Sequence, residues 1–233
     1  MEIFITVIIP TYNASGTIRP LVEQLETELY QYNFRIILID DASSDNTRDI
    51  ILSLAEDRPN IDYCFAARNK GQQASLLAGL KMISEPCKYV VTMDDDLQNP
   101  ASVIPSLIEK IESGYDLVYA IPTIGRSTCY RAPSGMRRLG SRFRDLLFDS
   151  FVKKPPGIKV SAFRIISYEL AQRIAASDKR FFYLSAEAFQ YDIQTANINY
   201  EYVPRAYGQS SYHFGKLLLV YLKLLITYKL KMI

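Results

Sequence analysis

The sequence contains few of the residues that mark several common protein classes. Its three cysteines (Cys64, Cys87 and Cys129) are odd in number, far apart and without metal-ligand spacing, so free thiols in a reducing cytoplasm are the simplest interpretation. The single histidine, His213, stands between a loop and a helix start and is interpreted as a cap or surface residue rather than a catalyst. No apolar run reaches the roughly 18 residues that a spanning helix needs.

Two nucleotide-binding motifs are also missing. Neither G-x-G-x-x-G nor G-x-x-x-x-G-K-[ST] occurs, so the sequence supports neither a Rossmann dinucleotide site nor a P-loop. At the N-terminus, the apolar stretch over 4–9 has no basic region before it and no small-residue cleavage site after it. We therefore interpret it as a strand and not as a signal peptide.

Length and composition are those of an ordinary globular protein. The 233 residues, 48% hydrophobic and 22% charged, suffice for one large α/β domain or two small ones, and no linker divides them. The net charge of +2 is unevenly distributed, because residues 123–160 carry +7. Singly, the arginines of this segment are ordinary solvated residues. As a cluster, Arg126, Arg131, Arg137 and Arg138 are expected to face an anionic acceptor or a bilayer.

Strands alternate with helices through the first half of the chain. Apolar runs predict strands over 4–9, 35–39, 62–66, 89–93 and 116–121. Helical spacing predicts helices over 17–30, 72–83 and 101–112, and another in which Ile50, Ile51 and Leu54 share a face. This alternation indicates βαβ units and an α/β fold with a mostly parallel central sheet flanked by helices.

The second half is less regular. It contains a helix predicted over 137–151, a strand over 162–166, a helix capped by Ser167, and a late strand over 197–203. The tail over 213–233 is rich in leucine and lysine, which predicts an amphipathic helix lying on a membrane interface or packed on protein.

Three consecutive carboxylates follow the apolar strand over 89–93. Asp94, Asp95 and Asp96 lie where ligands of open α/β sheets bind, outside the carboxyl ends of the strands. Clustered carboxylates repel one another, and a hard cation such as Mg²⁺ or Mn²⁺ would remove that cost. Alternation along an extended stretch would place Asp94, Asp96 and Gln98 on one side and Asp95 on the other. An acidic turn that caps the next helix is the alternative, but three carboxylates are more than a cap needs.

Two more polar loops, over 10–16 and 40–46, also follow strands. In a parallel sheet these loops and the aspartate loop gather at one edge, which indicates a nucleotide-binding crevice. Polar loops after strands are common, but Asp40 and Asp41 directly after an apolar run are more specific. A carboxylate there can accept a hydrogen bond from a base N–H or a ribose hydroxyl.

Together these segments resemble the family 2 glycosyltransferases. The resemblance rests on V-I-I-P-T-Y-N over 7–13, I-D-D-A-S-S-D-N-T over 39–47, N-K-G-Q over 69–72 and D-D-D-L-Q-N-P over 94–100. Later segments over 158–164 and 205–212 also match, so it covers nearly the whole chain. It implies a GT-A fold over 1–212, and the D-L-Q form is similar to the dolichyl-phosphate mannose synthase and bacterial polyprenyl-phosphate glycosyltransferase branch.

The resemblance also implies roles for individual residues. Donor-binding residues would be Pro10, Tyr12, Asn13, Asp41, Lys70, Gly71, Asp94 and Asp95. Metal ligands would be Asp94, Asp96 and Gln98, with Mg²⁺ or Mn²⁺ as the cofactor. Relatives often carry Glu where this chain has Ala14, and the segment over 122–135 departs from the family pattern.

Three residues are expected to carry the chemistry: Asp96, Arg164 and Glu187. Arg164, placed at the end of a predicted strand, would contact the leaving phosphate, or else form a structural salt bridge. Glu187 is a candidate base if the acceptor is a hydroxyl, whereas a buried ion pair or an exposed helix face is equally compatible with the sequence.

The function expected is metal-dependent inverting transfer of a sugar from a nucleotide diphosphosugar to a polyprenyl-phosphate-type lipid carrier. Transfer to a hydroxyl of a lipid-linked glycan in surface polysaccharide synthesis is the first alternative, and a non-catalytic nucleotide- or metal-binding module is another. The protein is expected to be cytoplasmic and peripheral to the inner face of the membrane, with a homo-oligomer left open. No recognised motif supports nucleic-acid binding.

Overall fold

The computed structural model describes residues 4–84, 86–123, 154–179, 181–202 and 227–228. The arginine cluster, the helix expected over 137–151, the motif over 205–212 and His213 lie outside the described residues. So does the C-terminal segment expected to be helical, apart from residues 227–228.

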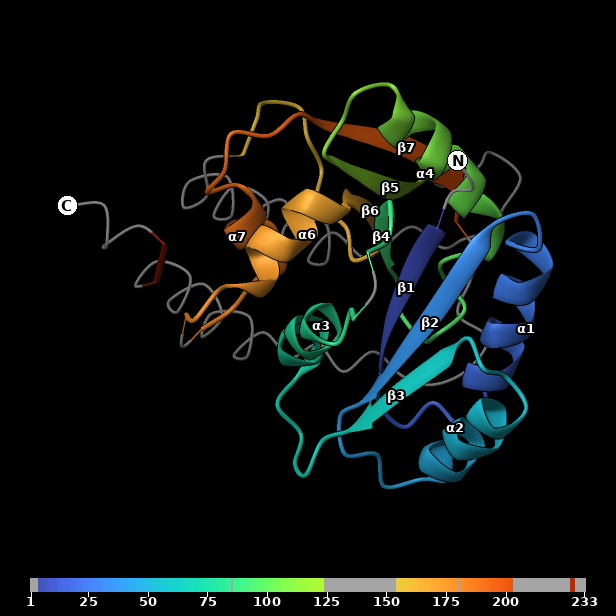
Figure 1. The fold of residues 1–233 in the computed structure, drawn as a ribbon. Helices are drawn as coiled ribbons and strands as arrows, with labels where there is room; N and C mark the ends of the chain where they lie inside the picture. Colours follow the sequence, from blue (N-terminus) through green and yellow to red (C-terminus); the bar gives the residue numbers. More distant parts are fainter. Residues whose placement is uncertain (1–3, 85, 124–153, 180, 203–226, 229–233) are drawn as a thin grey trace, which may run out of the picture.

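Seven strands and seven α-helical or 3₁₀ segments make up the described part of the fold (Figure 1). The strands are β1 (Phe4–Thr11), β2 (Asn33–Asp40), β3 (Ile61–Phe65), β4 (Tyr89–Thr92), β5 (Leu117–Thr123), β6 (Arg164–Ser167) and β7 (Thr195–Glu201). The helices are α1 (Ile18–Glu28), α2 (Thr47–Glu56), α3 (Gln72–Lys81), the 3₁₀ turn η1 (Ala101–Val103), α4 (Ile104–Glu112), α6 (Tyr168–Ala175) and α7 (Leu184–Ala188).

The strands form one sheet in the order β3-β2-β1-β4-β6-β5-β7. β6 runs antiparallel to both of its neighbours, whereas the other strand pairs are parallel. The expectation of a mostly parallel α/β sheet is confirmed. Because β6 is reversed, its first residue lies at the same edge as the last residues of the parallel strands.

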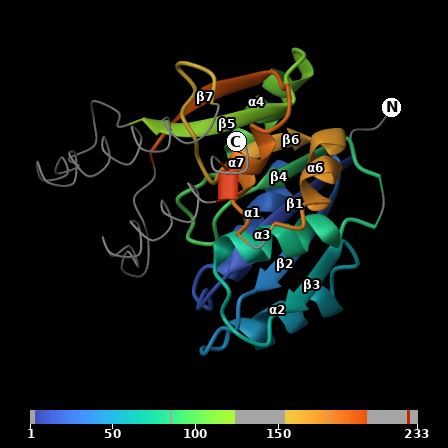
Figure 2. The ribbon, with the colours of Figure 1, turned by 90° about the vertical axis from the view of Figure 1, so that its left-hand side faces the viewer.

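Helices cover both faces of the sheet. Helices α1, α2 and α4 lie on one face, and α3, α6 and α7 lie on the other (Figure 1). Their buried side chains belong to two separate apolar clusters, one on each face. Figure 2 shows α3, α6 and α7 from the side of the sheet that they cover. The central strands β1 and β4 are apolar on both sides because both faces are covered, while the edge strand β7 alternates between buried and exposed positions.

α3 approaches the sheet unusually closely. A Cβ atom added at Gly79 would lie 2.4 Å from Cγ2 of Ile8, so only a glycine lets the helix reach this distance from β1. Leu76 and Leu80 are buried on this face as expected, but Leu77 and Ile83 are only half-buried, and the helix ends at Lys81.

Other boundaries agree to within a few residues. The hydroxyl of Ser167 accepts a hydrogen bond from the N–H of Leu170, so the cap expected for α6 is confirmed. The helix expected over 101–112 begins with the 3₁₀ turn η1, and the apolar stripe of α4 is fully buried. Within the described ranges, none of the helices has both the length and the hydrophobicity to cross a bilayer.

Candidate active site

The three polar loops expected to meet do so at one edge of the sheet. Thr11 at the end of β1 is paired with Asp40 at the end of β2, and Thr92 at the end of β4 is paired with Arg164. The loops that begin at Tyr12, Asp41 and Met93 therefore leave the sheet side by side. Topology brings together residues that are up to 152 positions apart in the chain, since Tyr12 and Arg164 belong to the same edge.

Hydrogen bonds join the loop after β1 to the loop after β2. The N–H of Asn13 donates to Ser43 Oγ at 2.8 Å, and Asn13 Oδ1 accepts from the N–H of Ser44 at 2.8 Å. Asn13 adopts a positive φ of 52°, which asparagine tolerates better than most residues. These bonds fix the backbone beside Tyr12, whose side chain is 51% exposed.

Asp41 is buried and holds the next loop. Its two carboxylate oxygens accept from the N–H groups of Lys70 at 2.8 Å and Gly71 at 2.7 Å. The side-chain amide of Asn69 donates to the Asp41 carbonyl at 3.2 Å. Each carboxylate oxygen can accept more than one bond, so the expected contact between Asp41 and a base N–H is compatible with this geometry. It stays a prediction, as does base contact by Pro10, which is buried in β1.

The aspartate loop is not extended, so the expectation based on alternation is wrong. β4 ends at Thr92, and Leu97 has a positive φ of 63°, which bends the chain. Asp95 Oδ2 accepts from the N–H of Tyr12 at 3.0 Å, and the grouping of Asp94, Asp96 and Gln98 as ligands stays a prediction. The alternative that these residues cap the following helix is not observed, since η1 has no side-chain cap.

Asp94 occupies the most perturbed position of the site. Its pKa is raised from 3.8 to about 6, first by burial and then by the nearby charges of Asp96 and Asp95, while Arg164 and a hydrogen bond from Gln72 act in the opposite direction. The side-chain amide of Gln72, the first residue of α3, donates to Asp94 Oδ1. An excess of negative charge therefore exists at this position.

These residues fit a hard divalent cation. Within the described ranges, no three His, Cys, Asp or Glu side chains converge to form a complete protein cage. Mg²⁺ and Mn²⁺ sites that rely on one or two carboxylates and on substrate phosphates do not need such a cage. The donor set expected from the sequence, Asp94, Asp96 and Gln98, is held in place: Asp96 Oδ1 accepts from the N–H of Gln98, and Gln98 Nε2 donates to the Tyr202 hydroxyl at 2.8 Å.

Arg164 begins β6, rather than ending it as expected, and pairs with Thr92, two residues before Asp94. It is 3% exposed. Its Nε donates to Thr92 Oγ1 at 3.1 Å and to the Ala162 carbonyl at 3.3 Å, and its Nη1 donates to Ser185 Oγ at 2.7 Å. Among the described residues these acceptors are all neutral, so the structural salt bridge considered for Arg164 is not observed there. A buried guanidinium without a carboxylate partner is suited to an anionic ligand.

Glu187 forms the buried ion pair that the sequence left open. It is 3% exposed, and its two oxygens lie 2.8 and 2.7 Å from Nζ of Lys179. Its Oε2 also accepts from the Tyr228 hydroxyl at 3.0 Å. The carboxylate is thus compensated by a cation, and its role as a base stays a prediction.

Several residues of the site were not identified from the sequence. Gln72 contacts Asp94, and Asn99 Oδ1 accepts from the N–H of Asp94 at 3.0 Å. Tyr200 and Tyr202, at the end of β7, bond to Asn99 and Gln98. The spacing of two residues puts both tyrosines on one side of a strand, but only their hydrogen bonds show that the end of β7 reaches the aspartate loop.

Solved structures with the same architecture are GT-A glycosyltransferases. Glucosyl-3-phosphoglycerate synthase from Mycobacterium tuberculosis, solved with Mn²⁺, UDP-glucose and phosphoglyceric acid, has a TM-score of 0.61 at 16% identity over 96% of this chain and 80% of that chain. TarS 1-349 from S. aureus gives 0.55 at 19% identity over 87% and 59%. The mannosyltransferase PcManGT from Pyrobaculum calidifontis, in complex with GDP-Man and Mn²⁺, gives 0.52 at 18% identity over 75% and 47%. At such identities the similarity establishes the fold alone.

The sequence defines the family. Residues 6–183 match the family model for glycosyl transferase family 2, and the chain belongs to this family. Among curated relatives, the undecaprenyl-phosphate 4-deoxy-4-formamido-L-arabinose transferases of Yersinia enterocolitica and Serratia proteamaculans are 28% and 29% identical over 217 residues, or 92% of this chain. This chain spans 64% of the length of either relative. The resemblance to family 2 is confirmed, and these relatives are named as transferases to undecaprenyl phosphate.

Proposed function

We propose that this protein transfers a sugar from a nucleotide diphosphosugar to a polyprenyl-phosphate-type lipid carrier, with inversion at the sugar. The observation that carries this proposal is the excess negative charge at Asp94, two residues after Thr92, which pairs with the first residue of β6, the buried Arg164. A cation at the carboxylates and a diphosphate between the cation and the guanidinium would neutralise both. Relatives named as undecaprenyl-phosphate sugar transferases support the same acceptor class.

The donor would lie along the edge formed by the loops after β1, β2 and β4. The exposed ring of Tyr12 offers an apolar face to a base, and Asp41 offers carboxylate oxygens to its N–H groups. Asn13, Lys70 and Gly71 shape the pocket through the hydrogen bonds that join these loops. Asp95 keeps the loop of Tyr12 next to the metal-binding loop.

Asp94, Asp96 and Gln98 would hold Mg²⁺ or Mn²⁺, as the two neighbours solved with Mn²⁺ suggest for the family. When bound, such a cation supplies a Lewis acid for the diphosphate. Arg164 would then stabilise the charge that develops on the leaving phosphate, since its guanidinium is fixed by three hydrogen bonds before the donor arrives.

A phosphate acceptor is favoured over a hydroxyl acceptor by the state of Glu187. A lipid phosphate is already an anion and needs no base, whereas a hydroxyl must lose a proton. Glu187 is 3% exposed and paired with Lys179, so it is poorly suited to take that proton. A polyprenyl phosphate is embedded in a bilayer, and we therefore propose that the protein works in peripheral contact with the inner face of the membrane.

The test is a transfer assay that starts from a thermal-shift screen. Nucleotide sugars with Mn²⁺ are screened first, because a ligand raises the melting temperature by mass action. The best donor, labelled in its sugar, is then incubated with undecaprenyl phosphate in detergent, and labelled lipid is extracted. We expect label in the lipid, loss of transfer with EDTA, and loss in Asp96→Asn, with Asp178→Asn at an exposed site as the matched control. Binding of donors without turnover on any acceptor would leave a non-catalytic binding module as the function.

A further inference from the structure

The first turn of α7 is held by side chains from two distant parts of the chain. The N–H of Tyr183, which precedes the helix, donates to the hydroxyl of Tyr228 at 3.2 Å, and the N–H of Leu184 donates to Gln73 Oε1 at 2.9 Å. The helix has only five residues and no cap from its own N-cap residue, Tyr183. Unsatisfied N–H groups at a helix start need partners, so these two contacts determine where α7 begins.

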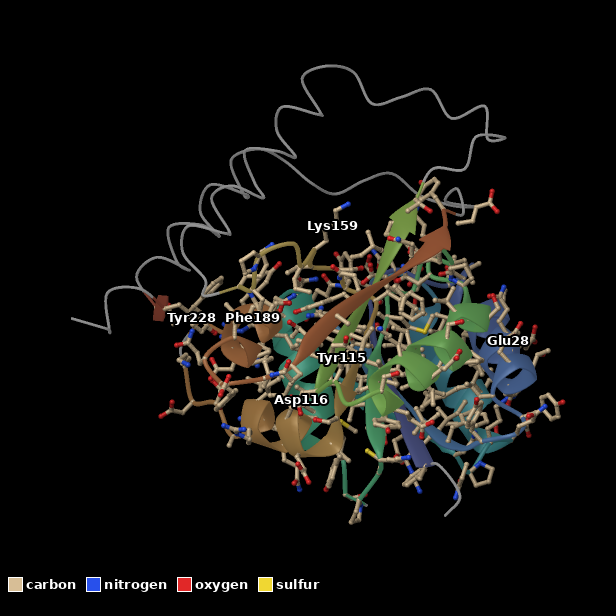
Figure 3. The ribbon with its side chains drawn as sticks, turned by 90° about the horizontal axis from the view of Figure 1, so that it is seen from above. Glu28, Tyr115, Asp116, Lys159, Phe189 and Tyr228 are labelled. Atoms are coloured by element: carbon tan, nitrogen blue, oxygen red, sulfur yellow. The ribbon has the colours of Figure 1, made fainter. Side chains whose placement is uncertain are left out.

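Tyr228, which lies near the C-terminus of the sequence, is buried beside α7. It is 3% exposed and shares an apolar cluster with Phe189, the residue that follows α7; Figure 3 shows both on the same side of the molecule. Its hydroxyl donates to Glu187 at 3.0 Å while accepting from Tyr183, and Nζ of Lys179 lies 4.9 Å from its ring centroid. Tyr228 therefore connects both ends of α7 through a single hydroxyl group.

α7 in turn contacts the donor site. Ser185 is fully buried, and its Oγ accepts from Nη1 of Arg164 at 2.7 Å. On α3, Gln73 bonds to Leu184 while the preceding residue, Gln72, bonds to Asp94. Two sets of hydrogen bonds thus connect the first turn of α7 to the residues proposed to bind the diphosphate and the cation.

From this arrangement we propose that Tyr228 is a positioning residue for the transferase site: it fixes α7 so that Ser185 orients the guanidinium of Arg164. This inference rests on the proposed function, in which Arg164 contacts the leaving phosphate. Arg164 contributes most when charge develops on that phosphate. Misplacement of its guanidinium group therefore lowers kcat more than it lowers the affinity for the donor. Tyr228 is then a part of the active-site scaffold through one hydroxyl group.

The test combines Tyr228→Phe, Ser185→Ala and the double variant. Tyr228→Phe removes the hydroxyl and keeps the ring in the apolar cluster, and Ser185→Ala removes only the acceptor of Arg164. We expect each single variant to lower kcat about 10-fold with the donor Kd changed less than about 2-fold, and the double variant to lose about 10-fold rather than 100-fold. Tyr191→Phe, which loses a hydrogen bond to the Arg173 carbonyl on the same side of the sheet, is the matched control and should retain kcat.

A second readout does not depend on turnover. Hydrogen exchange should rise in Tyr228→Phe both in α7 and in β6 around Arg164, while in Ser185→Ala it should rise around β6. Multiplicative losses of kcat, or increased exchange in Tyr228→Phe that stops within 183–189, would overturn the inference. Absence of transfer by the wild-type protein on every acceptor would instead count against the proposed function, and the exchange experiment would still decide whether Tyr228 and Arg164 are coupled.

Discussion

Replacing Asp94 by asparagine in the metal-free protein measures how much the negative charge of Asp94 lowers the free energy of unfolding. Burial and the neighbouring aspartates raise the pKa of Asp94 from its ordinary 3.8 to about 6. A pKa raised by about two corresponds to about 3 kcal/mol, at roughly 1.4 kcal/mol per pH unit. Because Asp94 is only half-buried, we expect solvent to reduce this to about 1–3 kcal/mol.

The sign of the effect follows from proton linkage. The folded state binds the Asp94 proton more tightly than the unfolded state, so the cost is absent below about pH 4, appears as the pH rises from 3.8 to about 6, and is complete above that. Asparagine is neutral at every pH, and its Oδ1 can still accept the hydrogen bond from Gln72. The variant should therefore match the wild type at pH 4 and exceed its free energy of unfolding by about 1–3 kcal/mol at pH 7.5.

Urea unfolding in EDTA at the two pH values is the assay. Asp178→Asn, at an exposed position in the loop after α6, is the control and should change stability by less than about 0.5 kcal/mol at both. With Mn²⁺ and a nucleoside diphosphate at about 100 times Kd, the wild type should gain about 2.7 kcal/mol through binding that the variant has lost, so the advantage of the variant should nearly vanish or reverse. A variant equally or less stable than the wild type at pH 7.5 in EDTA would refute the idea that the aspartate cluster stores unfavourable charge.

Two further substitutions test the packing of the fold and the role of Glu187. Gly79→Ala should lower the free energy of unfolding by about 1–3 kcal/mol in urea titrations, since its Cβ would meet Ile8, whereas Gly16→Ala, with nothing within 4 Å, should be neutral or slightly stabilising. Glu187→Gln should destabilise the protein by about 1–3 kcal/mol, because it leaves Lys179 without its ion-pair partner. It should nevertheless keep turnover with a polyprenyl phosphate to within about 5-fold, and complete loss of kcat with intact donor binding would instead identify Glu187 as a base and favour a hydroxyl acceptor.

Several features that depend only on residues close in the sequence were predicted correctly. The apolar runs of β1, β2 and β4 were identified because buried parallel strands need side chains that are apolar on both faces. The cap of α6 by Ser167 was also local and was confirmed. The loops of Tyr12, Asp41 and Asp94 were correctly expected at one edge, since parallel topology places every strand end there.

Contacts made across the sheet were not predictable in this way. β6 begins at Arg164, and only its antiparallel direction places this first residue at the edge where the parallel strands end. The bend at Leu97 replaced the expected alternation of side chains. Glu187 had several compatible environments, and only the tertiary structure showed that it pairs with Lys179 and accepts a hydrogen bond from Tyr228.

The sequence by itself determined the family, the α/β alternation and the aspartate loop after β4, because each depends on residue types at short spacing. Tertiary structure decided the partners of those residues: Gln72 on Asp94, Ser185 on Arg164 and Lys179 on Glu187. Which side chains meet across a sheet is set by strand order and direction, and long-range packing of the whole chain fixes both.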